Sequence, residues 1–138
     1  MSYGLRIDLE RPFDDVVALT KESLAQSGFG ILTEIDVRQT LKNKLDVDVD
    51  SQVILGACNP GFAYKGLQIE PSLGVLLPCN VVVRHTGGVT VVEAIDPETM
   101  VAITDNPEME PLADEVRDAL RAALDRVYVS VTGRTEGV

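Results

Sequence analysis

The sequence predicts an α+β fold: a mainly antiparallel β-sheet with helices packed on one face and a long C-terminal helix. A Gly-Gly pair at residues 87–88 joins two strand-like segments into an antiparallel hairpin. Only the first two predicted strands are joined by a long helix, whereas a doubly wound parallel sheet needs such crossovers throughout. Aromatic residues make up 4% of the chain, so the core must be aliphatic. A βαβ-type mixed sheet is the alternative.

The first half of the chain alternates strands with helices. The segment "YGLRIDL" alternates apolar and polar residues, which predicts a strand over 3–9. Apolar residues at helical spacing follow, with Pro12 at their start and Gly28 past their end, and predict a helix over 12–27. The next expected elements are a strand near 29–36, a short helix over 37–44 and a strand over 52–58.

In the second half, proline marks several boundaries. Asn59 is a preferred helix N-cap and Pro60 a preferred first residue, so we expect a short helix over 60–70. Pro78 cannot donate to a β-ladder and needs an edge position or a bulge. The two strands of the hairpin are expected over 74–85 and 89–95.

The C-terminal helix has the clearest pattern in the chain. Its apolar residues form one stripe: Leu112, Val116, Ala119, Leu120, Ala123 and Val127. After Tyr128 the helical signal is lost. We therefore expect a single α+β domain over residues 1–129 and a flexible tail over 130–138.

Composition narrows the classes of partner. The formal charge is −10, with 12 basic residues scattered among 22 acidic ones. Nucleic acids and acidic membrane surfaces both require clustered Lys and Arg, so neither is an expected partner. No apolar run reaches the ~20 residues that span a bilayer, and charges occur too early for a signal peptide. We expect a soluble cytoplasmic protein whose two cysteines are free thiols.

The candidate site is the segment "ILGACNPGFAYKGLQIEPSLGVLLPCNVVV", residues 54–83, where an asparagine follows each cysteine. If Asn59 caps a helix beginning at Pro60, Cys58 lies beside unpaired backbone N–H groups and the positive end of the helix dipole. That environment favours a thiolate, and Lys65 in the same helix is a candidate to strengthen it. The alternative is that Cys58 is a small buried apolar residue ending a strand.

Cys79 alternates with Leu77, Val81 and Val83, a pattern that favours a core position. The only histidine, His85, lies about 20 Å from Cys79 along a regular strand, so the two cannot share an ion. A zinc site wants four ligands, and we expect no metal, although two thiolates could hold a soft ion such as Cu(I). A permanent disulfide is not expected in a reducing compartment, but a redox-sensing one stays open.

The segments "GFGILTEIDVRQTLKNKL", "ILGACNPGFAYKGLQIEPSLGVLLPCNVVV" and "VVEAIDPETM" resemble the bacterial and archaeal family called domain of unknown function 302. The resemblance spans roughly residues 28–100. It implies a TBP-like α+β fold with a curved antiparallel sheet, in which 37–45 and 60–70 are insertions, and it implies a homodimer. It implies no established activity. A fold does not fix function, so the TBP-like fold does not predict DNA binding.

Three functions stay open. The favoured one is a small-molecule or soft-ion binding module, with its site between the sheet and the 60–70 helix, whose N-terminus would favour a small anionic ligand. The second is a thiol enzyme or redox sensor, in which Cys58 attacks and Cys79 resolves. The third is purely structural, with function at a dimer or partner surface. The candidate ligand-binding residues are Cys58, Asn59, Pro60, Lys65, Cys79 and Asn80.

An enzyme is the weaker hypothesis. No catalytic base, metal triad or cofactor loop accompanies the thiols, and we expect no cofactor.

Overall fold

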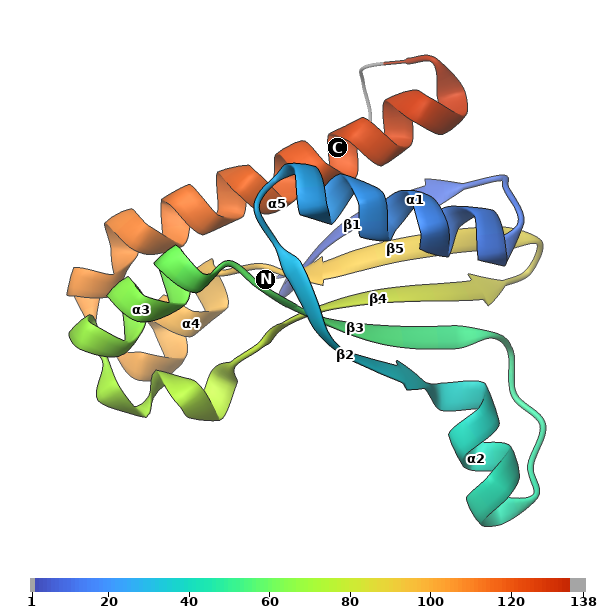
Figure 1. The fold of residues 1–138 in the computed structure, drawn as a ribbon, viewed down its shortest axis with the longest axis horizontal. Helices are drawn as coiled ribbons and strands as arrows, with labels where there is room; N and C mark the ends of the chain where they lie inside the picture. The colour runs from blue at the N-terminus through green and yellow to red at the C-terminus, as the bar shows by residue number, and fades with distance from the viewer. Residues whose placement is uncertain (1, 135–138) are drawn as a thin grey trace.

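A computed structural model describes residues 2–134 of the chain, which form a five-stranded sheet with helices (Figure 1). The elements are β1 (Gly4–Leu9), α1 (Phe13–Gln26), β2 (Gly30–Asp36), α2 (Val37–Leu45), β3 (Gln52–Cys58), α3 (Pro60–Ile69), the 3₁₀ helix η1 (Pro71–Leu76), β4 (Cys79–Thr86), β5 (Val89–Ile95), α4 (Glu98–Thr104), the 3₁₀ helix η2 (Pro107–Met109) and α5 (Glu110–Thr132).

The sheet has the strand order β1-β5-β4-β3-β2, and every neighbouring pair is antiparallel. Strands β1 and β2 follow each other in sequence but form opposite edges, because α1 crosses one face of the sheet between them (Figure 1). The hairpin turn uses Gly87 at φ 56° and Gly88 at φ 79°, the left-handed conformations that a two-residue turn needs. The antiparallel α+β prediction is confirmed. The alternative of a mixed sheet is wrong for residues 2–134.

The two faces of the sheet differ in character. One face lies under α1 and α5 and carries the core, whose β1 members are Leu5, Ile7 and Leu9. On the other face Arg6 pairs with Asp8 at 2.7 Å, and Arg84 on β4 pairs with Glu93 on β5 at 2.9 Å. This alternation is typical of an antiparallel sheet with one wet face.

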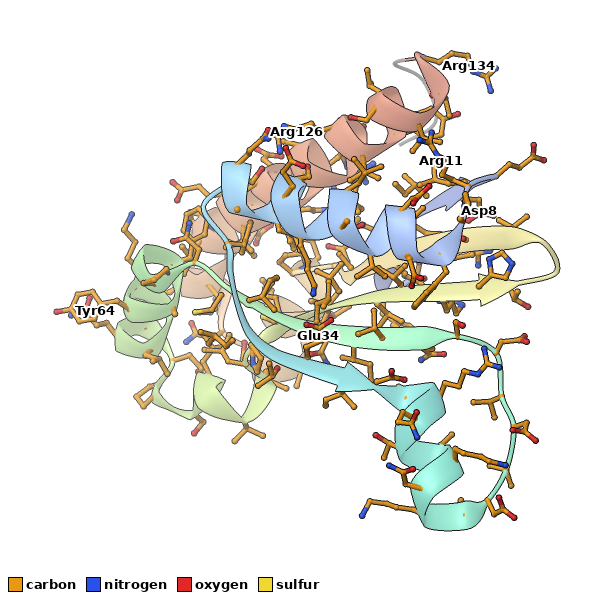
Figure 2. The ribbon with its side chains drawn as sticks, turned by 45° about the vertical axis from the view of Figure 1, so that its right-hand side comes forward. Asp8, Arg11, Glu34, Tyr64, Arg126 and Arg134 are labelled. Carbon is orange, nitrogen blue, oxygen red and sulfur yellow. The ribbon has the colours of Figure 1, made fainter. Side chains whose placement is uncertain are left out.

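A polar contact fixes α1 against α5. The buried hydroxyl of Ser23 on α1 donates to the carbonyl of Ala123 at 2.6 Å. The guanidinium of Arg126, on the α5 side that faces α1 (Figure 2), donates to the carbonyl of Ser23 at 2.8 Å. A cation at the end of a helix also compensates its dipole, and the last turn of α1 has no basic residue of its own.

Two elements differ from their predicted bounds. The segment predicted as the start of a strand at residue 74 instead forms η1, and β4 begins only at Cys79. The reason is Pro71, which starts a helical turn, together with buried Leu73, whose side chain packs on Gly66 of α3. Pro78 lies directly before β4, which begins at Cys79, so it takes no place in the ladder.

Helix α5 extends to Thr132, and residues 130–132, predicted to begin a flexible tail, are helical. Val131 packs against the core one turn beyond Val127, so tertiary contact outweighs the low helix propensity of this Val- and Thr-rich end. Gly133, at φ 71°, ends the helix. Residues 135–138 of the predicted tail lie outside the described residues.

The remaining predicted helices and strands agree with the structure to within one residue at each end. The particular likeness to TBP stays a prediction. Across residues 2–134, every helix is either too short or too polar to cross a lipid bilayer.

Candidate functional site

The first Cys-Asn corner, the turn formed by Cys58, Asn59 and Pro60, has the structure that its sequence predicts. Strand β3 ends at Cys58, and the side-chain oxygen of Asn59 accepts a hydrogen bond from the backbone N–H of Phe62 at 3.1 Å. Pro60 is the first residue of α3, where its missing N–H is not needed. Because the side chain of Asn59 accepts from the N–H of Phe62, one of the backbone N–H groups at the start of α3 that an anion could have used is already satisfied.

The second corner lies directly beside the first. Cys79 begins β4 and pairs with Ala57, the residue before Cys58. Side chains alternate between the faces of a sheet, so Cys79 shares the core face with Ala57, while Cys58 and Asn80 belong to the other face. Cys79 is 7% exposed and Cys58 is half-buried. Asn80, which pairs with Gly56 on β3, is exposed.

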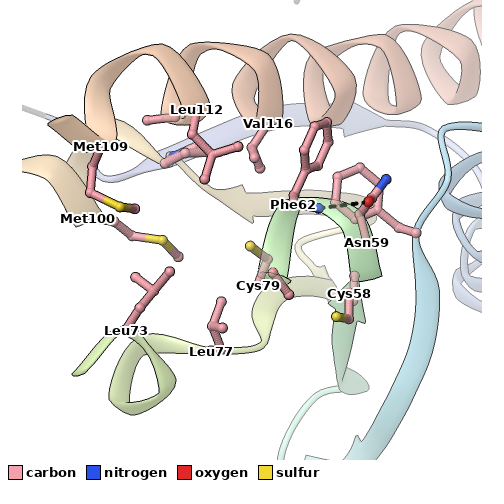
Figure 3. Close-up of a pocket in the computed structure, with 15 residues that line it drawn as sticks. Cys58, Asn59, Phe62, Leu73, Leu77, Cys79, Met100, Met109, Leu112 and Val116 are labelled. Atoms are coloured by element: carbon pink, nitrogen blue, oxygen red, sulfur yellow. Dashed lines mark hydrogen bonds between the residues drawn. The ribbon is translucent and has the colours of Figure 1, made fainter. Parts of the chain in front are cut away.

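A cavity of about 40 Å³ joins the two corners (Figure 3). It lies between the ends of β3 and β4 and the helical segments α3, η1, α4, η2 and α5, and its lining is almost entirely apolar. A water molecule occupies ~10–15 Å³ on this measure, so the cavity has room for roughly three water-sized groups. A drug-sized ligand fills ~300–1,000 Å³ and does not fit without rearrangement.

The cavity brings together three of the six predicted site residues, namely Cys58, Asn59 and Cys79. Pro60 and Asn80 are exposed and do not line it. Lys65 lines a separate open depression beside α5, which contains the acidic side chains Glu108 and Glu115. Lys65 is therefore directed to another surface rather than to the thiols.

Burial decides the protonation of the second thiol. Removal from water raises the pKa of Cys79 from 9.0 to about 11, and the nearby Cys58 adds a smaller effect in the same direction. A thiol with this pKa is neutral at pH 7 and is a weak nucleophile. Both cysteines are free thiols in the structure.

Two residues that the sequence did not single out complete the cavity. Met100 on α4 and Met109 at the end of η2 are both buried and both line it. Figure 3 shows their side chains and the sulfur of Cys79 directed toward the same space, whereas the sulfur of Cys58 is directed away. The two methionines lie in short helical segments without a long-range pattern, so no periodicity could have placed them beside Cys79.

A conventional metal centre is not formed here. Among residues 2–134, the structure contains no group of three or more His, Cys, Asp or Glu side chains that could hold a metal ion. His85 lies at the hairpin end of β4, where its Nδ1 is 2.9 Å from the hydroxyl of Thr90. This is far from Cys79 along the strand, as its spacing predicts.

Comparison with known proteins places the chain in a family whose function is not known. The family model described as "Domain of unknown function DUF302" matches residues 5–127. A crystal structure of an uncharacterized conserved DUF302 protein from Bacillus stearothermophilus is similar, with 30% sequence identity and a TM-score of 0.86. The similarity covers 92% of this chain and 99% of that one. No curated protein matches the chain.

Proposed function

The chain belongs to the DUF302 family, and we propose that it is a binding module whose site is the apolar cavity at the ends of β3 and β4. One observation carries this proposal. Two corners that are twenty-one residues apart in sequence, Cys58-Asn59 and Cys79-Asn80, meet at one apolar cavity, into which the sulfur of Cys79 is directed. Apolar pockets with a few polar groups are where proteins bind small ligands.

The volume and lining restrict the class of ligand. At about 40 Å³ the cavity accepts a single ion or an apolar group of a few atoms. An anionic ligand is disfavoured, because no cationic side chain lines the cavity and burying an unpaired charge is costly. The ligand is therefore a soft ion or a very small apolar molecule.

The thiol-redox alternative has less support. Cys79 is neutral at physiological pH because its burial raises its pKa to about 11. Cys58 and Cys79 also lie on opposite faces of adjacent strands, and side chains that point apart cannot form a disulfide without backbone movement. The structural alternative is supported by Asn59, whose oxygen is bonded to the backbone of α3.

The test measures whether a guest enters the cavity. Protein carrying ¹³C-labelled methionine methyl groups is exposed to xenon and to Ag(I), and the Met100 and Met109 resonances are followed by NMR. We expect at least one guest to shift both resonances. The variant Ala113→Val fills the cavity, because Ala113 lines it from α5, and should abolish the shift. Ala122→Val adds the same atoms at an exposed position of α5 and should preserve it.

If neither guest shifts the methionine resonances of the native chain, the binding proposal is wrong. The two Cys-Asn corners are then purely structural, and the function lies at a dimer or partner surface.

We further infer that two copies of the chain associate through β2 and α2. Strand β2 is a free edge of the sheet, and α2 buries none of its residues within the single chain. The β2–α2 unit exposes the large apolar side chains Leu32, Ile35 and Leu45, and the loop after it exposes Val47. An unpaired strand edge is a ready template for a second strand, and an apolar face is normally covered.

A further inference from the structure

We propose that the ligand of the cavity is Cu(I), held by the sulfur atoms of Cys79, Met100 and Met109. This inference rests on the proposed function, because it names the ion that the cavity binds. The three sulfur atoms come from three separate elements, the start of β4, α4 and η2.

The three sulfur-bearing side chains share one apolar cavity. Cys79, Met100 and Met109 are 7%, 5% and 3% exposed, and all three line the cavity. Figure 3 shows the Cys79 sulfur and both methionine side chains directed into it. The thiol of Cys79 has no hydrogen-bond partner among the described residues, so a soft ligand would displace no existing interaction of the sulfur.

The chemistry of the donors selects the ion. Thiolate and thioether sulfur are soft ligands that select Cu(I), whereas Mg²⁺ and Ca²⁺ require oxygen ligands. Carboxylates and histidine are not among the residues that line the cavity, and structural zinc sites are built from four Cys, His or carboxylate ligands. Sulfur donors alone thus favour Cu(I) over zinc.

Charge balance distinguishes a monovalent from a divalent ion. Two thioethers are neutral, and one thiolate carries a single negative charge. A Cu(I) ion bound to the Cys79 thiolate therefore forms a neutral unit in the apolar cavity. A divalent ion would leave one uncompensated positive charge, which is costly to bury.

Binding must release a proton. The neutral thiol of Cys79 loses its S–H proton to solvent as the sulfur–copper bond forms, and copper stays Cu(I), so no electron is transferred. Because the thiol must lose this proton in order to bind the ion, the apparent affinity rises with pH. The expected dependence is tenfold per pH unit between pH 6 and 8, with one proton released for each ion.

The experiment is an anaerobic Cu(I) titration in competition with a colorimetric chelator. We expect one Cu(I) per chain, with binding at least a hundredfold weaker in Cys79→Ser. In Met100→Leu and Met109→Leu, which keep side-chain volume, we expect binding at least tenfold weaker. The control Leu120→Met makes the reverse exchange in the core outside the cavity and should bind as the native chain does. Thermal melting without copper checks that each variant folds.

Three results would overturn the proposal. They are unchanged affinity in both methionine variants, a larger loss in Cys58→Ser than in Cys79→Ser, and Zn(II) binding as tight as Cu(I). Xenon entry is measured separately and does not depend on sulfur ligation. If xenon enters but Cu(I) does not bind, the cavity is still a binding site and only the choice of ion is wrong.

Discussion

At the scale of single residues, Asn59 connects the start of α3 with the turn that follows α1. Its side-chain oxygen caps α3, and its amide nitrogen lies where a Cβ on Gly28 would come within 2.8 Å. Gly28 has φ +86°, beyond the end of α1. The glycine therefore serves both the turn after α1 and the packing of the asparagine that precedes the cavity.

We predict that Gly28→Ala destabilises the protein more than an equivalent change in a turn with open space. Gly88 has φ +79° and no atom within 4 Å of an added Cβ, so Gly88→Ala reports the backbone strain alone, about 1–2 kcal/mol. Gly28→Ala should lose about 1 kcal/mol more, because the new methyl displaces the Asn59 cap. Urea unfolding of both variants measures the difference. Equal losses would mean that Asn59 moves aside freely.

We also predict an alkaline loss of stability that depends on Cys79. The pKa of this thiol is raised from 9.0 to about 11 in the folded chain by burial. The unfolded chain loses the proton near pH 9, so between pH 9 and 11 the folded state binds more protons and stability falls as pH rises. The contribution is complete below pH 9 and lost above pH 11, a change of about 2–3 kcal/mol at most.

The measurement is urea unfolding at several pH values between 8 and 11, for the native chain and Cys79→Ala. Lysine and tyrosine titrations are common to both proteins and cancel in the difference. The native chain should lose stability more steeply. Parallel curves would show that Cys79 titrates normally in the folded state.

At the scale of elements, local signals were sufficient where one residue type decides the conformation. The Asn59-Pro60 cap and the Gly-Gly turn both act through backbone requirements that sequence shows directly. The start of β4 and the end of α5 differ from their predicted bounds because tertiary packing decides them. Leu73 of η1 packs on Gly66 of α3, and Val131 packs against the core. Lys65 illustrates the same limit, since helix spacing alone does not say which face meets the cavity.

Helix α1 contains a polar group that its surroundings do not satisfy. Thr20 is 1% exposed, and its hydroxyl has no hydrogen-bond partner among the described residues. We predict that Thr20→Val, which has the same shape, stabilises the protein by about 1 kcal/mol, because it removes the desolvation of an unpaired hydroxyl. Thr20→Ser keeps the hydroxyl, loses a methyl group and should destabilise it. Thermal and urea unfolding compare the two, and a loss of stability in Thr20→Val would show that the hydroxyl is partnered in solution.

At the scale of the whole molecule, the fold class could be predicted from the sequence, but the cavity that Cys79 shares with Met100 and Met109 could not. The hairpin and the single crossover indicate an antiparallel α+β sheet. The cavity depends instead on η1, α4 and η2, whose positions follow from packing against α3 and α5. Met100 and Met109 therefore line the same cavity as Cys79 only in the folded chain, and their spacing in the sequence does not predict it.

We predict that two copies of the chain associate through the β2–α2 unit. Figure 1 shows α2 projecting away from the rest of the molecule, and β2 contacts another strand on one side only. Pairing of two β2 edges would continue the sheet across a two-fold axis and cover the exposed side chains of Leu32 and Ile35. We expect the native chain to have twice the chain mass in solution by light scattering.

The variant Ile35→Lys places a charge on each copy at the proposed contact, and like charges facing each other should give a monomer. Val75 is 86% exposed on η1, away from β2, so Val75→Lys makes the same chemical change and should remain a dimer. If both variants are dimers, association uses another surface, and if the native chain is a monomer at high concentration, the inference of a dimer fails. Cu(I) binding should be equal in the dimer and the monomeric variant, because all three proposed ligands belong to one chain.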